Sequence, residues 1–143
     1  MRRILFFVAI IVIGFGFMPI GNAQKLDAKI GNDPNVRIGK LDNGMTYYIR
    51  HNAKPEGRVE FRLAVNAGSC QEDEDQRGLA HFTEHMAFNG IEGYPHNDMI
   101  DQLQKIGVTF GLGINAYTSF DETVFMITMP TDNQKHIDFG INI

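Results

Sequence analysis

The segment that dominates this sequence reads Arg77-Gly-Leu-Ala-His-Phe-Thr-Glu-His-Met-Ala-Phe-Asn-Gly90. Within it Leu79, Phe82 and Met86 recur at three- and four-residue steps, a spacing that places their side chains on one face of a helix. Four acidic residues occupy positions 72–75, just before the helix, where the helix dipole favours negative charge. The segment ends on a glycine, as helices commonly do. It is therefore predicted to be an amphipathic helix.

The same segment contains the order H-x-x-E-H. His81 and His85 are four residues apart, so their imidazoles lie on one face of the helix, one turn apart. Zinc binds His nitrogens at about 2.0–2.1 Å, and a catalytic zinc ion takes three protein ligands and leaves one position open. Glu84 lies beside His85 and three residues from His81, close enough to act on a water molecule without binding the metal. Taken alone, the five residues also fit two surface histidines beside a solvated glutamate.

The surrounding blocks carry a family resemblance. Gly78–Gly90 resembles the zinc-site helix of the pitrilysin/insulysin-type peptidases, the inverzincins, a family that includes the mitochondrial processing peptidases. Upstream, Arg62–Ser69 resembles the strand and turn that lead into that helix. Downstream, Asn115–Ser119 and Glu122–Phe125 resemble the family's substrate-binding strand and the strand after it. The resemblance covers about residues 36–143.

The resemblance implies a zinc metalloendopeptidase of the HxxEH type that hydrolyses peptides or small proteins. It assigns one zinc ion to His81 and His85, and the role of catalytic base to Glu84. It implies that Asn115 and Ala116 lie on an edge strand that holds the peptide substrate by strand addition, which an unpaired strand edge permits. The alternative is an ordinary hairpin strand whose backbone groups are all paired internally, since periodicity does not distinguish an edge strand from a central one.

The third ligand is the missing part of this site. In the family it is a glutamate on a later helix, further along the chain than the residues that follow His85. The chain is therefore interpreted as an amino-terminal fragment, inactive by itself, that needs downstream domains. The alternative is a non-catalytic peptide-binding or partner module with the same fold. The presence of Glu84 favours descent from an active enzyme.

Composition limits the function classes. The chain has 143 residues, 43% hydrophobic and 21% charged, which suits one globular domain. Its formal net charge of −4 argues against nucleic acid as a partner, since no basic patch gathers phosphates. Cys70 is the only cysteine, so no internal disulfide forms. We interpret it as a small, partly buried side chain, with a redox-sensitive thiol or an extra metal ligand as the alternative.

The first 23 residues have the three parts of a signal peptide. Arg2 and Arg3 precede the apolar run Ile4–Ile13, and small residues at Gly21-Asn-Ala23 offer a cleavage site. The alternative is an uncleaved membrane anchor, but the apolar run is broken and shorter than the ~20 residues that a span needs. The sequence predicts an exported protein, periplasmic or extracellular, with no stable membrane span after cleavage.

The remaining chain predicts a loop at 24–35 and the amino-terminal part of a pitrilysin-type metallopeptidase domain at 36–143. Asp42-Asn-Gly44 is a strong hairpin signal between two strands. Periodicity predicts strands at 36–40, 45–50, 58–66, 108–119 and 123–129, a loop at 91–95, and helices at 77–90, at 98–106 and from 131–133 onward. In the last two helices, Asn97 is the predicted cap of the first, Met99, Ile100, Leu103 and Ile106 its core side, and Ile137 and Ile141 one face of the second. The predicted fold class is α+β, a sheet of mostly antiparallel strands with helices packed on one face.

Overall fold

The computed structural model describes residues 31–143. The predicted signal peptide at 1–23 and residues 24–30 of the predicted loop lie outside the described residues. The chain divides into two units, one that ends at His51 and one that runs from Asn52 to Ile143. Each unit is described by itself.

The first unit holds an antiparallel hairpin. Strand β1 (Val36–Lys40) pairs with β2 (Thr46–Arg50). The connecting turn is closed by the Leu41 N–H, which donates to the Met45 carbonyl at 2.8 Å, and by Gly44 at a φ of 92°. Glycine adopts this left-handed conformation at little cost. The predicted hairpin is confirmed.

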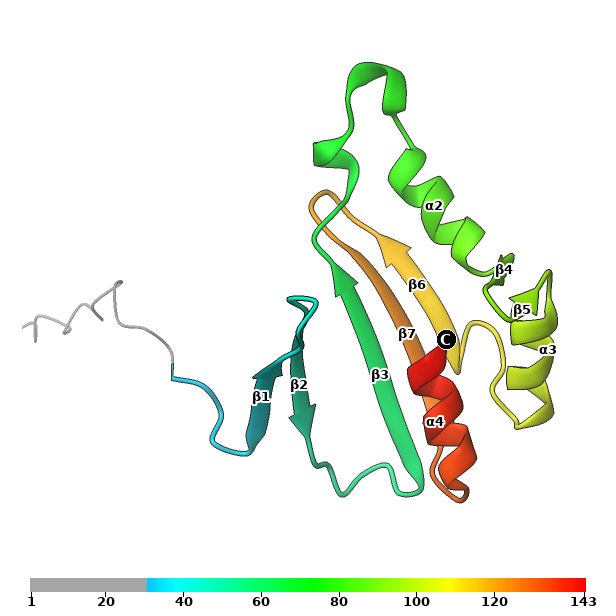
Figure 1. Cartoon of the computed structure of the whole chain (residues 1–143). Coiled ribbons are helices and arrows are strands. Elements are labelled where there is room, and N and C mark those ends of the chain that lie inside the picture. The colour runs from blue at the N-terminus through cyan, green and yellow to red at the C-terminus, as the bar shows by residue number, and fades with distance from the viewer. Residues whose placement is uncertain (1–30) are drawn as a thin grey trace, which may run out of the picture. The chain divides into compact units, whose positions relative to one another are not determined.

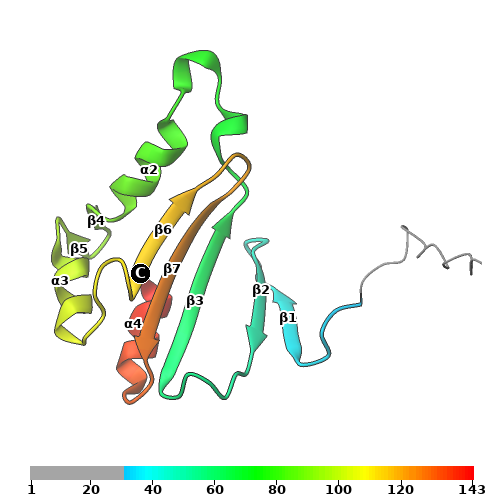
Figure 2. The same ribbon diagram turned by 180° about the vertical axis from the view of Figure 1, so that it is seen from behind.

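The second unit is built on a three-stranded antiparallel sheet in the order β3-β7-β6 (Figures 1 and 2). The strands are β3 (Arg58–Val65), β6 (Ile114–Thr118) and β7 (Thr123–Pro130). The predicted strand at 108–119 was wrong in its first half, because Gly111 at a φ of 88° turns the chain and its N–H donates to the Ile114 carbonyl. Regular pairing therefore begins only at Ile114.

Three helices accompany the sheet, α2 (Leu79–Ala87), α3 (Asp98–Lys105) and α4 (Gln134–Asn142). The short 3₁₀ turns η1 (Ser69–Gln71) and η2 (Glu74–Gln76) precede α2. Helix α4 lies in front of the sheet in Figure 1 and behind it in Figure 2. The predicted loop at 91–95 is instead part of a minimal hairpin of β4 (Gly90–Ile91) and β5 (Tyr94–Pro95). The α+β class is confirmed.

The hydrophobic core joins α3 to the sheet. Its buried residues are Met99, Leu103, Val108, Ile114 and Met129. Phe61, Ile127 and Phe139 are among the partly buried residues that pack against this cluster, which brings β3, β7 and α4 to the same core. The predicted core side of α3 is confirmed, since Ile100 and Ile106 also pack against it.

Two details of the helices differ from the prediction. Asn97 stands at the start of α3, but its side chain accepts no capping hydrogen bond, whereas Asn133 does cap α4 by accepting from the Lys135 N–H at 3.0 Å. Ile141 is exposed, because α4 approaches the sheet through Gly140. A Cβ at Gly140 would lie 2.8 Å from the Phe61 ring, so only glycine allows this approach.

Helix α2 presents an unexpected face to the sheet. Its predicted apolar residues Leu79, Phe82 and Met86 are exposed, Phe82 by 60%, whereas Glu84 is only 6% exposed. The helix is amphipathic as predicted, but the large side chains of its apolar face are exposed in the described residues. Glu84 makes a side-chain hydrogen bond to β6, so the face of α2 that carries it lies toward the sheet.

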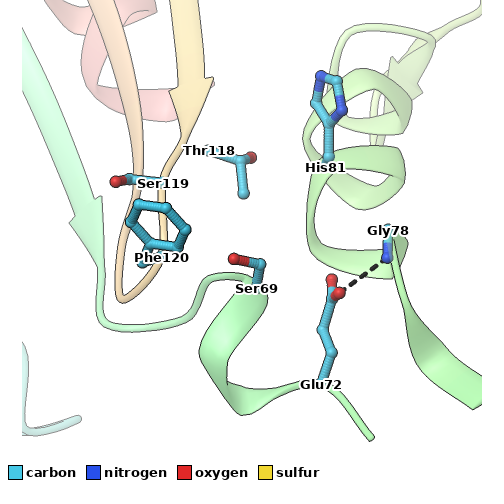
Figure 3. A pocket seen from close by; sticks show the side chains of 7 residues that line it. All are labelled: Ser69, Glu72, Gly78, His81, Thr118, Ser119 and Phe120. Atoms are coloured by element: carbon cyan, nitrogen blue, oxygen red, sulfur yellow. Dashed lines mark hydrogen bonds between the residues drawn. The ribbon is translucent and has the colours of Figure 1, made fainter. Parts of the chain in front are cut away.

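The start of α2 is held by Glu72. One carboxylate oxygen accepts a hydrogen bond from the Gly78 N–H at 2.7 Å (Figure 3), and the other accepts from the Ala80 N–H at 2.8 Å. These are donors that the first turn of a helix leaves without an internal partner. The bond from Ala80 and then that from Gly78 hold the pKa of Glu72 below its ordinary value of 4.5. Of the acidic residues at positions 72–75, Glu72 is thus the one that binds the N–H groups at the start of the helix.

We expect Glu72→Gln to lower the thermal unfolding midpoint at pH 7, because glutamine cannot supply two charged acceptors to α2. A carboxylate whose pKa is lower in the folded than in the unfolded state stabilises the fold at pH values above the unfolded-state pKa. That stabilisation is lost as the pH falls through the folded-state pKa. The difference between parent and variant should therefore narrow as pH falls below about 4.5. Circular dichroism melting from pH 7 to pH 3 measures it. Glu74→Gln, at an almost fully exposed side chain, is the control, and equal midpoints for Glu72→Gln and parent at pH 7 would contradict the assignment.

Candidate metal centre

The two histidines of α2 meet at their outer nitrogens. The Nε2 atoms of His81 and His85 are 3.0 Å apart, and the ring centroids are 4.6 Å apart. A tetrahedral ion with bonds of 2.0–2.1 Å places two ligand atoms about 3.3 Å apart. The pair therefore fits zinc after a shift of a few tenths of an ångström. Helical spacing produced this arrangement, as the sequence predicted.

Glu84 sits on the inward side of the same helix. The hydroxyl Oγ1 of Thr118 donates to Glu84 Oε2 at 2.8 Å. Thr123 lies opposite Thr118 in the sheet, and its hydroxyl donates to the Ala67 carbonyl at 2.8 Å. Sequence reasoning did not find Thr118 or Thr123, because no local pattern pairs residue 118 with residue 84. Only the fold brings β6 against α2.

A third metal ligand is not found in residues 31–143, where no three His, Cys, Asp or Glu side chains are grouped to hold an ion. The donor set there is two imidazoles, and the Glu84 carboxylate lies on the same helix. This set fits part of a catalytic zinc site, in which nitrogen ligands dominate and a non-ligating glutamate accepts a proton.

A cleft of about 380 Å³ opens beside His81. Figure 3 shows His81 on α2 across from Thr118 at the end of β6. The cleft is lined by residues in or next to η1, by the start of α2, and by the end of β6 with the turn that follows it: Ser69, Glu72, Gly78, His81, Thr118, Ser119 and Phe120. The Ser69 N–H donates to the Ser119 carbonyl at 3.1 Å, which fastens one wall of the cleft to the sheet.

Strand β6 forms one edge of the three-stranded sheet in the described residues. Asn115 and Tyr117 belong to the hydrogen-bonded pairs with β7, since Ser119 donates to the Glu122 carbonyl and antiparallel pairs alternate. The backbone N–H and C=O groups of Ala116 and Thr118 therefore point away from β7. The Ala116 N–H is held by Asn115 Oδ1 at 2.9 Å, so this amide occupies an edge donor in the present structure.

Cys70 is exposed, so its interpretation as a partly buried side chain was wrong. Its backbone rather than its thiol has the structural role, since the Cys70 N–H donates to the Phe120 carbonyl at 2.7 Å. Gly68, two residues earlier, lies so close to this turn that a Cβ there would be 2.5 Å from the Ser119 carbonyl oxygen.

Comparison with known proteins decides the family. Residues 47–139 match the sequence profile described as insulinase, peptidase family M16. The chain belongs to this family. The resemblance predicted from the HxxEH helix is thereby confirmed.

Related proteins are much longer than this chain. It is 45% identical over 111 residues to a probable zinc protease PqqL of Haemophilus influenzae, covering 78% of the chain and 12% of that relative. It is 44% identical over 121 residues to a zinc protease PQQL-like protein of Arabidopsis thaliana, covering 82% of the chain and 13% of the relative. The crystal structure of the periplasmic protease PqqL from Escherichia coli matches with a TM-score of 0.73 at 40% identity, over 77% of this chain and 12% of that one. The chain thus spans about an eighth of these relatives.

None of the helices between residues 31 and 143 combines the length and the apolar character needed to cross a bilayer.

We expect this chain to bind zinc weakly, because two imidazoles offer fewer ligands than a complete site. His85→Ala should reduce the affinity at least about tenfold, since one of the two nitrogen donors is lost. Calorimetric titration with zinc of the chain lacking residues 1–23 measures this. His51→Ala, at an exposed histidine of the first unit, is the control. Unchanged affinity after His85→Ala would remove the assignment.

Proposed function

We propose that this chain carries the catalytic base and two zinc ligands of an exported metalloendopeptidase. The observation that carries the proposal is the approach of His81 Nε2 and His85 Nε2 to 3.0 Å, with Glu84 held beside them on the same helix. Membership in peptidase family M16 supports it, as do relatives named zinc proteases. Peptides or small proteins are the proposed substrates.

The chemistry follows from the positions of these side chains. A bound zinc ion would supply Lewis-acid activation of water and of the scissile carbonyl. His81 and His85 would hold that ion through their neutral Nε2 atoms. Glu84 would accept a proton from the attacking water and deliver it to the nitrogen of the leaving amine.

Catalysis is proposed for a longer polypeptide. The matched part of this chain covers only 12% of a relative, and the described residues supply two nitrogen ligands where a catalytic zinc takes three protein ligands. We assign the third ligand to a glutamate beyond Ile143 and expect the isolated chain to be inactive. A non-catalytic module that binds peptides or partners is the competing function, and the activity measurement below separates the two.

Export is part of the proposal. Residues 1–23 have the charged start, apolar middle and small-residue cleavage site of a signal peptide. The structurally similar Escherichia coli protein is described as periplasmic. We infer that the working site is outside the cytoplasm, in the periplasm or the medium.

Substrate capture is assigned to Asn115 and Ala116. The outward N–H and C=O groups at Ala116 and Thr118 suit an extended peptide that pairs with the edge of β6. The Asn115 amide, which now accepts from the Ala116 N–H, would yield that donor to the peptide. The cleft beside His81 adjoins the end of this edge.

Replacement of the base tests the chemistry. In a longer polypeptide that contains this chain, Glu84→Gln should lower kcat by a factor of about 10²–10⁴, since glutamine keeps the shape but accepts no proton. Zinc content should stay unchanged. Turnover of an unstructured peptide and metal analysis measure the two effects. Glu92→Gln, in the exposed β4–β5 turn, is the control. Near-parental turnover with Glu84→Gln, or an inactive parent with zinc bound, would contradict the proposal.

Proline at the sheet edge tests peptide capture. Ala116→Pro removes an outward N–H and no bond to β7, so peptide affinity should fall about tenfold or more while zinc binding persists. Fluorescence anisotropy with a labelled Val- and Thr-rich peptide of about ten residues, which favours an extended form, measures it.

The matched control is Ala64→Pro. Ala64 lies on the opposite edge strand β3, where the Thr131 N–H to Gly57 carbonyl bond and antiparallel alternation place its N–H away from β7. This variant should bind the peptide as the parent does. Equal peptide affinity of Ala116→Pro and the parent, with both folded, would exclude strand addition at β6.

A further inference from the structure

The burial of Glu84 raises a question about what holds its carboxylate. A carboxylate that is only 6% exposed is costly unless it accepts hydrogen bonds. Among the described residues, the one side chain that donates to it is Thr118, through Oγ1 to Oε2 at 2.8 Å. No described residue donates to the other oxygen, Oε1. One oxygen of the carboxylate thus accepts a hydrogen bond from the protein, and the other remains available to accept a proton.

The Thr118 hydroxyl is itself oriented. Thr123 faces it from β7, with 3.4 Å between the two hydroxyl oxygens, and is almost fully buried. The shorter contact of Thr123 Oγ1 is to the Ala67 carbonyl at 2.8 Å, so its proton points there. A threonine hydroxyl has a single proton. Thr123 therefore does not donate to Thr118. The proton of Thr118 goes to Glu84, because an ionised carboxylate only accepts hydrogen bonds.

Thr118 also stands on rigid backbone. It belongs to β6, opposite Thr123 in the register, while Glu84 belongs to α2. The hydrogen bond therefore connects α2 to β6, the edge strand at which the peptide is proposed to bind. A glutamate side chain has three rotatable bonds, and a fixed partner reduces the number of positions that it samples.

We propose that Thr118 is a positioning residue for Glu84, acting through the hydrogen bond from Oγ1 to Oε2. The inference rests on the proposed role of Glu84 as the base. General-base catalysis requires the accepting oxygen to lie within hydrogen-bond reach of the proton it removes. The Thr118 hydroxyl binds Oε2 and limits the rotation of the Glu84 side chain, so that Oε1 stays available to accept the proton. Neither His81 nor His85 takes part in this hydrogen bond.

The test uses three variants of a longer polypeptide that contains this chain. Thr118→Val keeps the shape and removes the hydroxyl, so kcat should fall about 10- to 100-fold, with KM and zinc content close to the parental values. Thr118→Ser restores the hydroxyl and should return most of the lost kcat. Thr83→Val is the control, because the Thr83 hydroxyl lies on the same helix but donates to the Leu79 carbonyl.

The possible outcomes distinguish a failure of the positioning role of Thr118 from a failure of the proposed peptidase function. If the parent is active and Glu84→Gln is not, but Thr118→Val keeps the parental kcat, the positioning role is wrong and Glu84 remains the base. Equal losses in Thr118→Val and Thr118→Ser, or a loss that follows zinc content or the thermal midpoint, would mean a structural role and overturn the inference. An inactive parent with zinc bound would overturn the proposed function, and this inference with it.

Discussion

The hydrogen bond from Thr118 to Glu84 is the contact on which the arrangement of the site depends. It joins α2 to β6 over 34 residues of sequence, and Glu84 rather than a large apolar side chain of α2 lies buried against the sheet. With Glu84 inward, His81 and His85 are left on the exposed side with their Nε2 atoms 3.0 Å apart. Helical spacing thus places the Glu84 carboxylate and the two imidazoles on different sides of a single helix.

The ends of α2 are fixed by other means. Glu72 supplies both acceptors for the Gly78 and Ala80 N–H groups, and its lowered pKa keeps it ionised over a wider range of pH. Ser69 and Cys70 donate to the β6–β7 turn, which ties the segment before α2 to the sheet. The cleft beside His81 is bordered by these same contacts. Helix, turn and sheet edge are therefore held as one framework around the histidines.

Local patterns in the sequence predicted what depends on short range. The pairing of His81 with His85 follows from helical spacing, and the hairpin around Gly44 follows from turn chemistry. The orientation of α2 was beyond such patterns: Phe82 belongs to an apolar stripe, yet it is exposed, whereas Glu84 is buried and hydrogen-bonded to β6. Thr118 was missed because no local pattern relates it to Glu84, which is 34 residues away in the sequence. Gly111 shortened the predicted strand because a left-handed turn competes with pairing.

The central claim is that His81 and His85 hold zinc while Glu84 stays outside the coordination shell, fastened by Thr118. A crystal structure of the zinc-loaded protein, with anomalous diffraction collected above and below the zinc edge, tests it directly. We predict one anomalous peak about 2.0–2.1 Å from both Nε2 atoms, with Glu84 Oε2 still accepting from Thr118. A peak elsewhere in the chain, or Glu84 bound directly to the ion, would contradict it.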